Sequence, residues 1–136
     1  MKSSKKNKEK SEPTRSELEI LRVLWKQGAS TVRLVNDELN KEHRQVNYTS
    51  TLKLMQIMAE KGILKRDESN MKHIYSPVEE EHMTKSYLLE KFVNTMYNGS
   101  ASGLMMQLLG NKKPSKKELQ EIKALVDKLD KEESLK

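Results

Sequence analysis

Residues 46–62 carry apolar side chains at the spacing of a helix that buries one side. Positions i, i+3, i+4 and i+7 share a helix face, and here they are Thr51, Leu54, Met55 and Met58. A rotation of about 100° per residue puts another set outside: Thr49, Leu52, Lys53, Gln56 and Ile57. Asn47 suits the N-cap and Gly62 the left-handed residue after the last turn. The pattern predicts a helix over residues 49–60 with a largely polar outer face.

Two β-capable runs follow this helix directly, at residues 63–68 and 73–78, with a polar turn at 69–72 between them. Such a pair predicts a β-hairpin, and we expect Tyr75 to lie in the core. The hairpin carries four basic groups: Lys65, Arg66, Lys72 and His73. Asp67 and Glu68 dilute that charge, so the hairpin is at most a modest phosphate clamp. A helix that leads into a basic hairpin is the outline of a winged helix-turn-helix.

Two shorter helices are expected before this motif. Thr14/Glu17 and Ser16/Glu19 both fit a capping box, and Gly28 ends the first helix. Its predicted apolar stripe is Leu18, Leu21, Leu24 and Trp25. The short link at residues 29–31 can add a minimal strand beside the hairpin. The second helix is predicted over residues 32–40, and its buried positions are Val32, Val35 and Leu39.

Three helices are predicted after the hairpin. Pro77 suits the first position of a helix, and Ser76 and Glu79 have capping-box spacing, so a helix is expected over residues 77–97. Residues 98–100 interrupt it, a short helix covers 101–109, and Ser115 with Glu118 caps a last helix.

The apolar stripes of these last helices are too exposed for an isolated unit of their size. Two interleaved copies would cover them, and a C2 dimer is the commonest solution. The alternative is that the helices fold back on their own N-terminal domain; we favour the dimer because recognition of two DNA half-sites usually needs two-fold symmetry. The predicted dimerisation residues are Leu88, Phe92, Met96, Leu104, Leu108, Leu119, Ile122, Val126 and Leu129.

Composition narrows the class of protein. In 136 residues, 35% are hydrophobic, with one Trp and one Phe, and so small a core favours self-association. The lack of cysteine excludes disulfides, thiolate catalysis and Cys-type zinc sites, and is compatible with a reducing cytoplasm. No run approaches the roughly 18 apolar residues of a membrane span, and no apolar segment follows the basic N-terminus as in a signal peptide.

The net charge of +6 is unevenly distributed. Residues 1–75 hold 16 Lys and Arg against 10 Asp and Glu, whereas residues 76–136 hold 10 of each. A favourable potential for a polyanion therefore accompanies the hairpin half, although a solvated lysine-rich surface would give the same count. Residues 1–12 are low-complexity and basic, which predicts a disordered tail that acts either as a DNA-contacting arm or as a solubilising segment.

Nothing in the sequence favours an enzyme. His43, His73 and His82 are scattered and fit no metal-ligand spacing, and no glycine-rich phosphate loop or nucleophile motif is present. Carboxylates at residues 79–81 are explained by the helix dipole alone. We expect no catalytic residue, no metal and no cofactor.

The outer face of the helix at 49–60 can bind DNA. Short polar, basic and methyl-bearing side chains contact base edges in a major groove, and Tyr48 and Ser50 lie where phosphates meet a helix N-terminus. The predicted DNA-binding residues are Tyr48, Thr49, Ser50, Leu52, Lys53, Gln56, Ile57, Arg44, Lys72 and His73. Exposed Leu52 and Ile57 support an alternative: a winged-helix protein-interaction module that does not bind DNA.

Four segments together resemble the BlaI/MecI (penicillinase repressor) family of bacterial transcriptional regulators, over about residues 13–130: TRSELEILRVLWKQGASTVRLVNDEL, NYTSTLKLMQIMAEKGILKRD, HIYSPV and FVNTMYNGSASGLMMQLL. The resemblance implies a mostly α fold with a small hairpin wing, in which a winged helix-turn-helix precedes a helical dimerisation domain. We expect the domains at 13–77 and 78–136. It further implies a homodimer that occupies a palindromic operator, with base contacts from Tyr48, Thr49, Ser50 and Lys53.

The resemblance also implies a route of inactivation. Antibiotic-resistance members are cut in the dimerisation domain after a membrane metalloprotease sensor is activated, and Gln107–Leu108 matches the cut position. Relatives often have an arginine where this chain has Ile57, which bears on operator sequence. Copper-responsive relatives carry a C-terminal cysteine cluster that this chain lacks, so that inducer is not expected.

Overall fold

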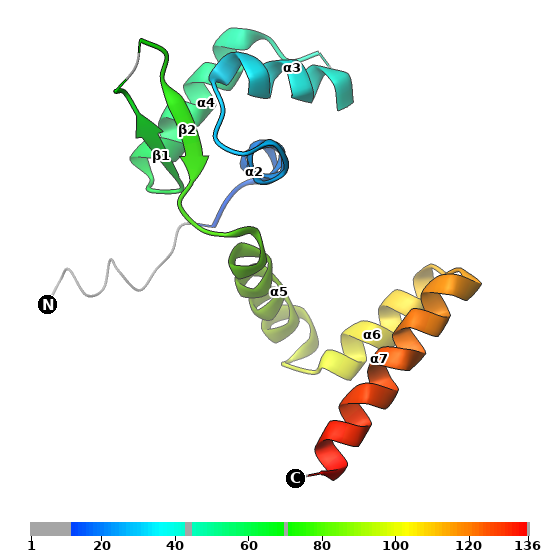
Figure 1. The fold of residues 1–136 in the computed structure, drawn as a ribbon. Helices are drawn as coiled ribbons and strands as arrows, with labels where there is room; N and C mark the ends of the chain where they lie inside the picture. Colours follow the sequence, from blue (N-terminus) through cyan, green and yellow to red (C-terminus); the bar gives the residue numbers. More distant parts are fainter. Residues whose placement is uncertain (1–11, 43–44, 70, 136) are drawn as a thin grey trace, which may run out of the picture. The chain divides into compact units, whose positions relative to one another are not determined.

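The computed structural model describes residues 12–42, 45–69 and 71–135 (Figure 1). The chain divides into two compact units, Met1–Leu88 and Leu89–Lys136. This division falls inside a helix, and the predicted domain boundary at residues 77/78 stays a prediction. The described elements are, in order, α2 (Arg15–Gln27), α3 (Val32–Glu42), α4 (Tyr48–Glu60), β1 (Leu64–Asp67), β2 (Ile74–Pro77), α5 (Glu81–Tyr97), α6 (Ala101–Asn111) and α7 (Lys116–Ser134).

Helix α2 begins at a capping box, as the sequence predicts. Of the two candidates, Thr14/Glu17 is used: the Thr14 hydroxyl accepts from the Glu17 N–H at 3.2 Å, and the Glu17 carboxylate accepts from the Thr14 N–H at 2.9 Å. Gly28, at φ +88°, ends the helix. Such a φ favours glycine because a Cβ would be strained there.

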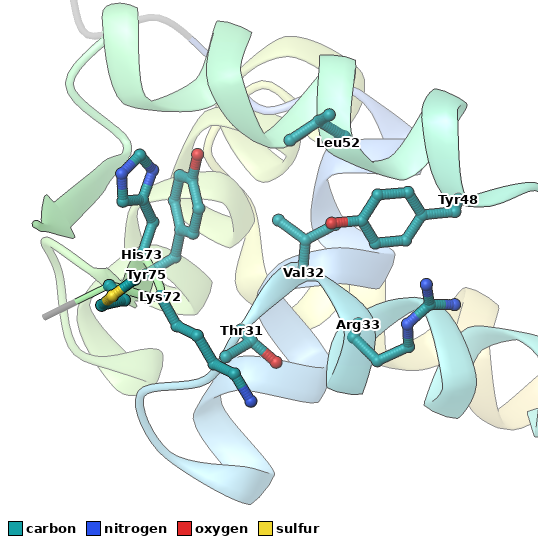
Figure 2. Close-up of a pocket in the computed structure, with 9 residues that line it drawn as sticks. Thr31, Val32, Arg33, Tyr48, Leu52, Lys72, His73 and Tyr75 are labelled. Atoms are coloured by element: carbon teal, nitrogen blue, oxygen red, sulfur yellow. The ribbon is translucent and has the colours of Figure 1, made fainter.

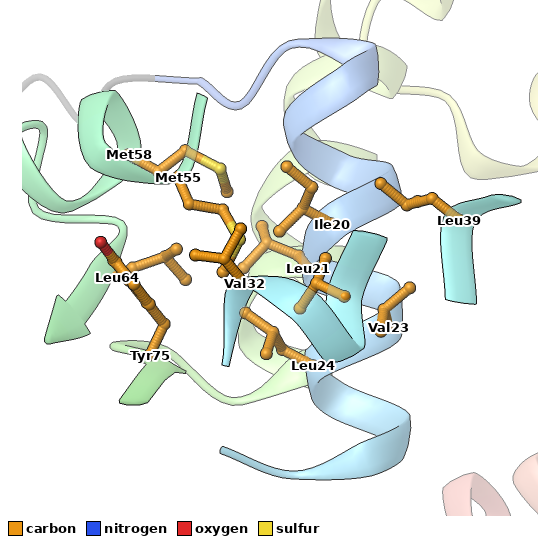
Figure 3. Packing of buried hydrophobic residues seen from close by; sticks show 11 residues of the cluster. Ile20, Leu21, Val23, Leu24, Val32, Leu39, Met55, Met58, Leu64 and Tyr75 are labelled. Carbon is orange, nitrogen blue, oxygen red and sulfur yellow. The ribbon is translucent and has the colours of Figure 1, made fainter. Parts of the chain in front are cut away.

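The hydrophobic core of the first unit forms where α2, α3, α4 and the hairpin meet (Figure 3). Ile20 and Val23 are buried although the predicted stripe omitted them, whereas Leu18 and Trp25 are only partly buried. The reason is that α2 contacts α3, α4 and β2, so more of its circumference is covered than a one-sided stripe assumes. The buried hydrophobic residues are Ile20, Leu21, Val23, Leu24, Val32, Val35, Leu39, Met55, Met58, Leu64 and Tyr75.

Helix α4 turns its predicted inner face to this core. Thr51, Met55 and Met58 are buried, and Leu54 packs partly buried against them. Asn47 caps the helix by accepting from the Ser50 N–H at 2.8 Å, and Gly62 follows it at φ +83°. The predicted caps and buried face of this helix are confirmed.

Strands β1 and β2 pair antiparallel, with Leu64 opposite Pro77 and Asp67 opposite Ile74. We call this hairpin the wing. The predicted minimal strand is also present: Ser30 exchanges two backbone hydrogen bonds with Tyr75, at 3.0 and 2.8 Å. Tyr75 is 1% exposed, which confirms its predicted place in the core.

The predicted start of a helix at Pro77 is wrong. Pro77 ends β2 opposite Leu64, and the next N–H, that of Val78, donates to Ile63 O at 3.0 Å. Strand pairing therefore continues past the proline, and α5 begins only at Glu81. Glu79, expected inside the helix, lies before it: its carbonyl accepts from Trp25 Nε1 at 3.1 Å and its carboxylate from Thr84 Oγ1 at 2.8 Å.

The second unit contains the end of α5 together with α6 and α7. Asn98 and Gly99, at φ +53° and +83°, end α5 as expected, and Ser100 caps α6. Helix α6 runs two residues beyond its predicted end, to Asn111, and the Ser115/Glu118 capping box of α7 is present as predicted. No helix in the described residues is long and apolar enough to span a membrane.

Candidate nucleic-acid interface

The outer face of α4 is exposed over most of its length. Thr49, Ser50, Lys53 and Gln56 are exposed, and Tyr48 and Ile57 are each 37% exposed. Leu52 departs from the prediction, because it is only partly buried and packs against the core. α3 and the wing flank the N-terminal half of α4. The exposed face of α4 is therefore narrower than that of an isolated helix.

A buried polar network fixes the start of α4 relative to α3. The Nδ2 of Asn36, whose side chain is buried, donates to Val46 O at 2.9 Å and to Thr51 Oγ1 at 2.8 Å. Asn40 Oδ1 accepts from the Val46 N–H at 2.6 Å. Buried polar groups need such partners, and here they join the two helices across the connecting turn. This network was not predicted, because only apolar residues were expected to be buried in α3.

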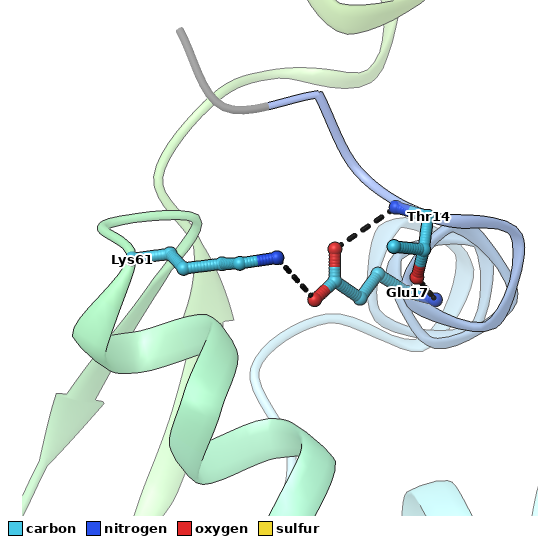
Figure 4. A network of polar contacts seen from close by, with 3 residues as sticks. All are labelled: Thr14, Glu17 and Lys61. Atoms are coloured by element: carbon cyan, nitrogen blue, oxygen red, sulfur yellow. Dashed lines mark hydrogen bonds and ion pairs between the residues drawn. The ribbon is translucent and has the colours of Figure 1, made fainter.

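An ion pair holds the other end of α4 (Figure 4). Lys61 Nζ lies 2.8 Å from Glu17 Oε2, and the Glu17 side chain is 2% exposed. The same carboxylate completes the capping box of α2 through its other oxygen. One acidic side chain therefore ties the start of α2 to the end of α4, and both ends of the candidate recognition helix are anchored.

A groove of about 460 Å³ opens between α3, α4 and the wing (Figure 2). Arg33 and Tyr48 lie on one side of it, and Lys72 and His73 on the other. The Arg33 Cζ is 4.4 Å from the centroid of the Tyr48 ring, a cation–π distance. We call it the wing groove and define it by its lining: Thr31, Val32, Arg33, Tyr48, Leu52, Met71, Lys72, His73 and Tyr75.

The four basic groups of the wing are not equivalent. Arg66 makes a 2.6 Å ion pair with Glu68. A hydrogen bond with Tyr75, and to a smaller extent one with Glu68, raises the pKa of its guanidinium above its ordinary value. Its charge is therefore largely compensated within the wing. Among the described residues, no carboxylate pairs with Lys65 or Lys72. The free positive charge of the wing lies mainly on these two lysines.

A second hollow, of about 720 Å³, lies between the C-terminal half of α4 and β1. Its lining includes the carboxylates Glu60 and Glu68 beside Lys65 and Arg66. Mixed charge of this kind is less favourable for a polyanion than the wing groove, whose lining contains no acidic residue. The charge distribution therefore favours the α3 side of α4 as the DNA-binding side.

The remaining predicted DNA contacts are placed as follows. Lys72 and His73 are exposed and line the wing groove. Arg44 lies outside the described residues. Arg33 and Thr31 were not predicted as site residues, although an exposed arginine in the first turn of the first helix of a helix-turn-helix was a signal that could have found Arg33. No group of metal-ligating side chains occurs in the described part of the chain.

The predicted dimerisation residues lie in two environments. Leu88, at the end of the first unit, and Leu104 are partly buried, whereas seven are exposed: Phe92, Met96, Leu108, Leu119, Ile122, Val126 and Leu129. No residue of α6 or α7 is buried within the chain. Gln107 and Leu108 are exposed on α6, where Gln107 Nε2 donates to Asn111 Oδ1 at 3.2 Å.

Comparison with known proteins gives one family and one curated relative. A family model described as penicillinase repressor matches residues 13–128. A curated penicillinase repressor from Bacillus licheniformis is 25% identical to this chain over 112 residues, which cover 82% of this chain and 87% of the relative. The matched region contains the exposed face of α4, the wing groove and most of α7.

Proposed function

The chain belongs to the penicillinase repressor family, a family of DNA-binding transcriptional repressors and not of enzymes, and we propose that it represses as a homodimer bound to a palindromic operator. The observation that carries this proposal is α4: a helix anchored at both ends, with an exposed face of hydroxyl, amide and ammonium groups. The proposed action on DNA implies a cytoplasmic protein, and no step in it needs a cofactor.

In the proposed complex, α4 enters the major groove of each half-site. Thr49, Lys53 and Gln56 face base edges, and Ile57, with partly buried Leu52, offers methyl groups to thymine. Tyr48 and Ser50 contact phosphates beside the N-terminus of α4. Arg44, Lys72 and His73 contact the flanking backbone, which adds affinity without sequence preference.

Duplex binding measured against salt tests this proposal. We expect log K to fall linearly with log salt, because each phosphate neutralised by a lysine or arginine releases counterions. Lys53→Ala should weaken operator binding by roughly 1–3 kcal/mol and unequally across sequences if Lys53 contacts a base. A wild-type slope near zero would overturn DNA binding and favour the protein-interaction module, for which the exposed Ile57 is the main support.

The apolar residues of α5, α6 and α7 support a second copy of this chain as the partner. Large hydrophobic side chains of α7 are 38–56% exposed, and they fall on one side of the helix: Leu119, Ile122, Leu125, Val126 and Leu129. A stripe of this kind on a soluble protein marks an interface. Linking two half-site-binding units raises the effective concentration of the second on DNA.

Sedimentation of a charge-matched pair of variants tests the dimer. Ile122→Glu places a carboxylate in the apolar stripe and should convert the protein to monomer, with a large loss of operator affinity. Gln120→Glu adds the same charge about 160° away from the stripe centre on α7 and should leave the dimer intact. Equal dimerisation of both variants would contradict the proposed interface.

We also propose that the repressor is inactivated by a cut between Gln107 and Leu108, triggered by a membrane metalloprotease sensor. Both residues are exposed, but they lie inside α6, so the helix must open locally before a protease can bind it. Mass spectrometry of the protein after induction in cells that carry the sensor should detect the fragment ending at Gln107. An intact chain after induction would reject this route.

A further inference from the structure

We propose that the wing groove binds one backbone phosphate of duplex DNA through the guanidinium of Arg33, which the ring of Tyr48 holds in position. The inference rests on the proposed function and adds a contact from α3, the first helix of the helix-turn-helix. It also gives Tyr48 a second role: Arg33 contacts the phosphate in the groove, and the Tyr48 ring positions Arg33, in addition to the phosphate contact already proposed for Tyr48.

The Arg33 guanidinium is available to bind a ligand. Its Cζ lies 4.4 Å from the Tyr48 centroid, and no carboxylate pairs with it in the described residues. Arg66 is the counter-example in the same unit, since Glu68 holds it at 2.6 Å. Of these two arginines, only Arg33 combines a fixed position with an uncompensated charge.

The aromatic contact leaves the N–H donors of Arg33 free to bind a phosphate. A guanidinium over a ring uses its flat face, whereas its N–H donors point outward in the plane. Two parallel N–H groups match the oxygens of a phosphate in bidentate geometry. The contact with Tyr48 therefore lowers the entropy cost of ordering Arg33 without consuming the donors that a phosphate needs.

The surroundings of the Arg33–Tyr48 pair are basic. Lys72 and His73 lie on the other side of the groove from Arg33 (Figure 2), and its lining contains no acidic residue. A volume of about 460 Å³ accommodates a phosphodiester and part of its sugars. In helix-turn-helix proteins the first helix crosses the DNA backbone while the second lies in the major groove, which is where a phosphate would meet α3.

The test compares Arg33→Ala with Arg22→Ala, a matched loss of an exposed arginine from α2 outside the groove. Fluorescence anisotropy with the full chain and a duplex should show about a tenfold loss for Arg33→Ala, the size of one charge-assisted hydrogen bond. The loss should be equal across duplex sequences, with a salt slope shallower by about one. Arg22→Ala should bind as the wild type does.

A methylphosphonate scan of the duplex identifies the contacted phosphate. Neutralising that phosphate should weaken binding of the wild type but not of Arg33→Ala, while substitutions elsewhere weaken both. Arg33→Lys, which keeps the charge but loses the bidentate fork, should recover part of the affinity and guards against a folding defect in the alanine variant.

The role of Tyr48 has its own readout. Tyr48→Phe keeps the ring, so Arg33→Ala should still cost about tenfold in that background, whereas in Tyr48→Leu the same change should cost much less. Equal losses for Arg33→Ala and Arg22→Ala, an unchanged salt slope, or a sequence-dependent loss would each overturn the inference. A wild-type slope near zero would instead reject the proposed function itself.

Discussion

The two units of this chain use their apolar residues in opposite ways. In the first unit, eleven hydrophobic residues from three helices and the wing are buried together. In the second unit, no residue between 89 and 135 is buried, and this unit carries most of the large exposed hydrophobics of the described residues. The first unit completes its core within one chain, whereas the exposed apolar residues of the second unit support the proposed dimer.

This difference separates what fixes α4 from what would bring two copies of α4 together in the proposed dimer. Helix α4 is held by contacts inside the first unit, at Asn36 near its start and at Glu17 beyond its end. Losing the dimer should therefore remove avidity while leaving each recognition helix intact.

The largest expected effect comes from truncating matched leucines in the two units. Leu24→Ala removes a side chain that is 1% exposed and should lower the free energy of unfolding by about 2–5 kcal/mol at any protein concentration. Leu129→Ala should instead act through the dimer, so its effect on the urea midpoint depends on protein concentration. A concentration-independent loss for Leu129→Ala would mean that the second unit packs within its own chain.

Asn36→Ala is expected to have the next largest effect. It leaves Val46 O and Thr51 Oγ1 without their partner across the turn, which should cost about 1–3 kcal/mol in the free energy of unfolding. Asn36→Ala should also weaken operator binding more than Asn40→Ala does, because the hydrogen bond from Asn36 no longer holds Thr51 at the start of α4. Thermal unfolding and anisotropy on both variants check this; equal DNA affinity would show that the network stabilises the fold only.

Lys61→Met should have a smaller effect. It leaves the buried Glu17 carboxylate with its capping-box contact but without its ion-pair partner. Because the Lys61 side chain is 31% exposed, solvent screening reduces the loss to roughly 1–2 kcal/mol. Lys65→Met, at an exposed position with no carboxylate partner among the described residues, is the control for urea unfolding. Identical midpoints for the two variants would contradict a stabilising role for the pair.

The smallest effect concerns the tip of the wing. Hydrogen bonds from Ser69, including its N–H at 2.9 Å, lower the pKa of the Asp67 carboxyl below its ordinary value of 3.8. A lowered pKa in the folded state means that this contribution is present above pH 3.8 and is lost as the pH falls below it. The Ser69 amide proton should therefore shift in NMR spectra below that pH, and the shift should be absent in Asp67→Ala.

Local signals made much of the fold predictable. Capping residues Thr14, Asn47 and Ser115 act within four residues of their partners, so sequence spacing alone identifies them. The inner face of α4 follows from helical period in the same way. The helix start at Pro77 was predicted incorrectly because proline suits both a helix start and the end of an edge strand. The choice depended on pairing with β1, thirteen residues away.

The sequence by itself determined where most helices begin and end, which face of α4 is apolar, and that α7 carries one continuous hydrophobic stripe. These properties depend on neighbours within one or two helical turns. Only the tertiary structure decided that Glu17 meets Lys61, that Asn36 meets Thr51, and that Arg33 lies over Tyr48. Such pairs join residues far apart in the chain, and the packing of whole elements, not local spacing, brings them together.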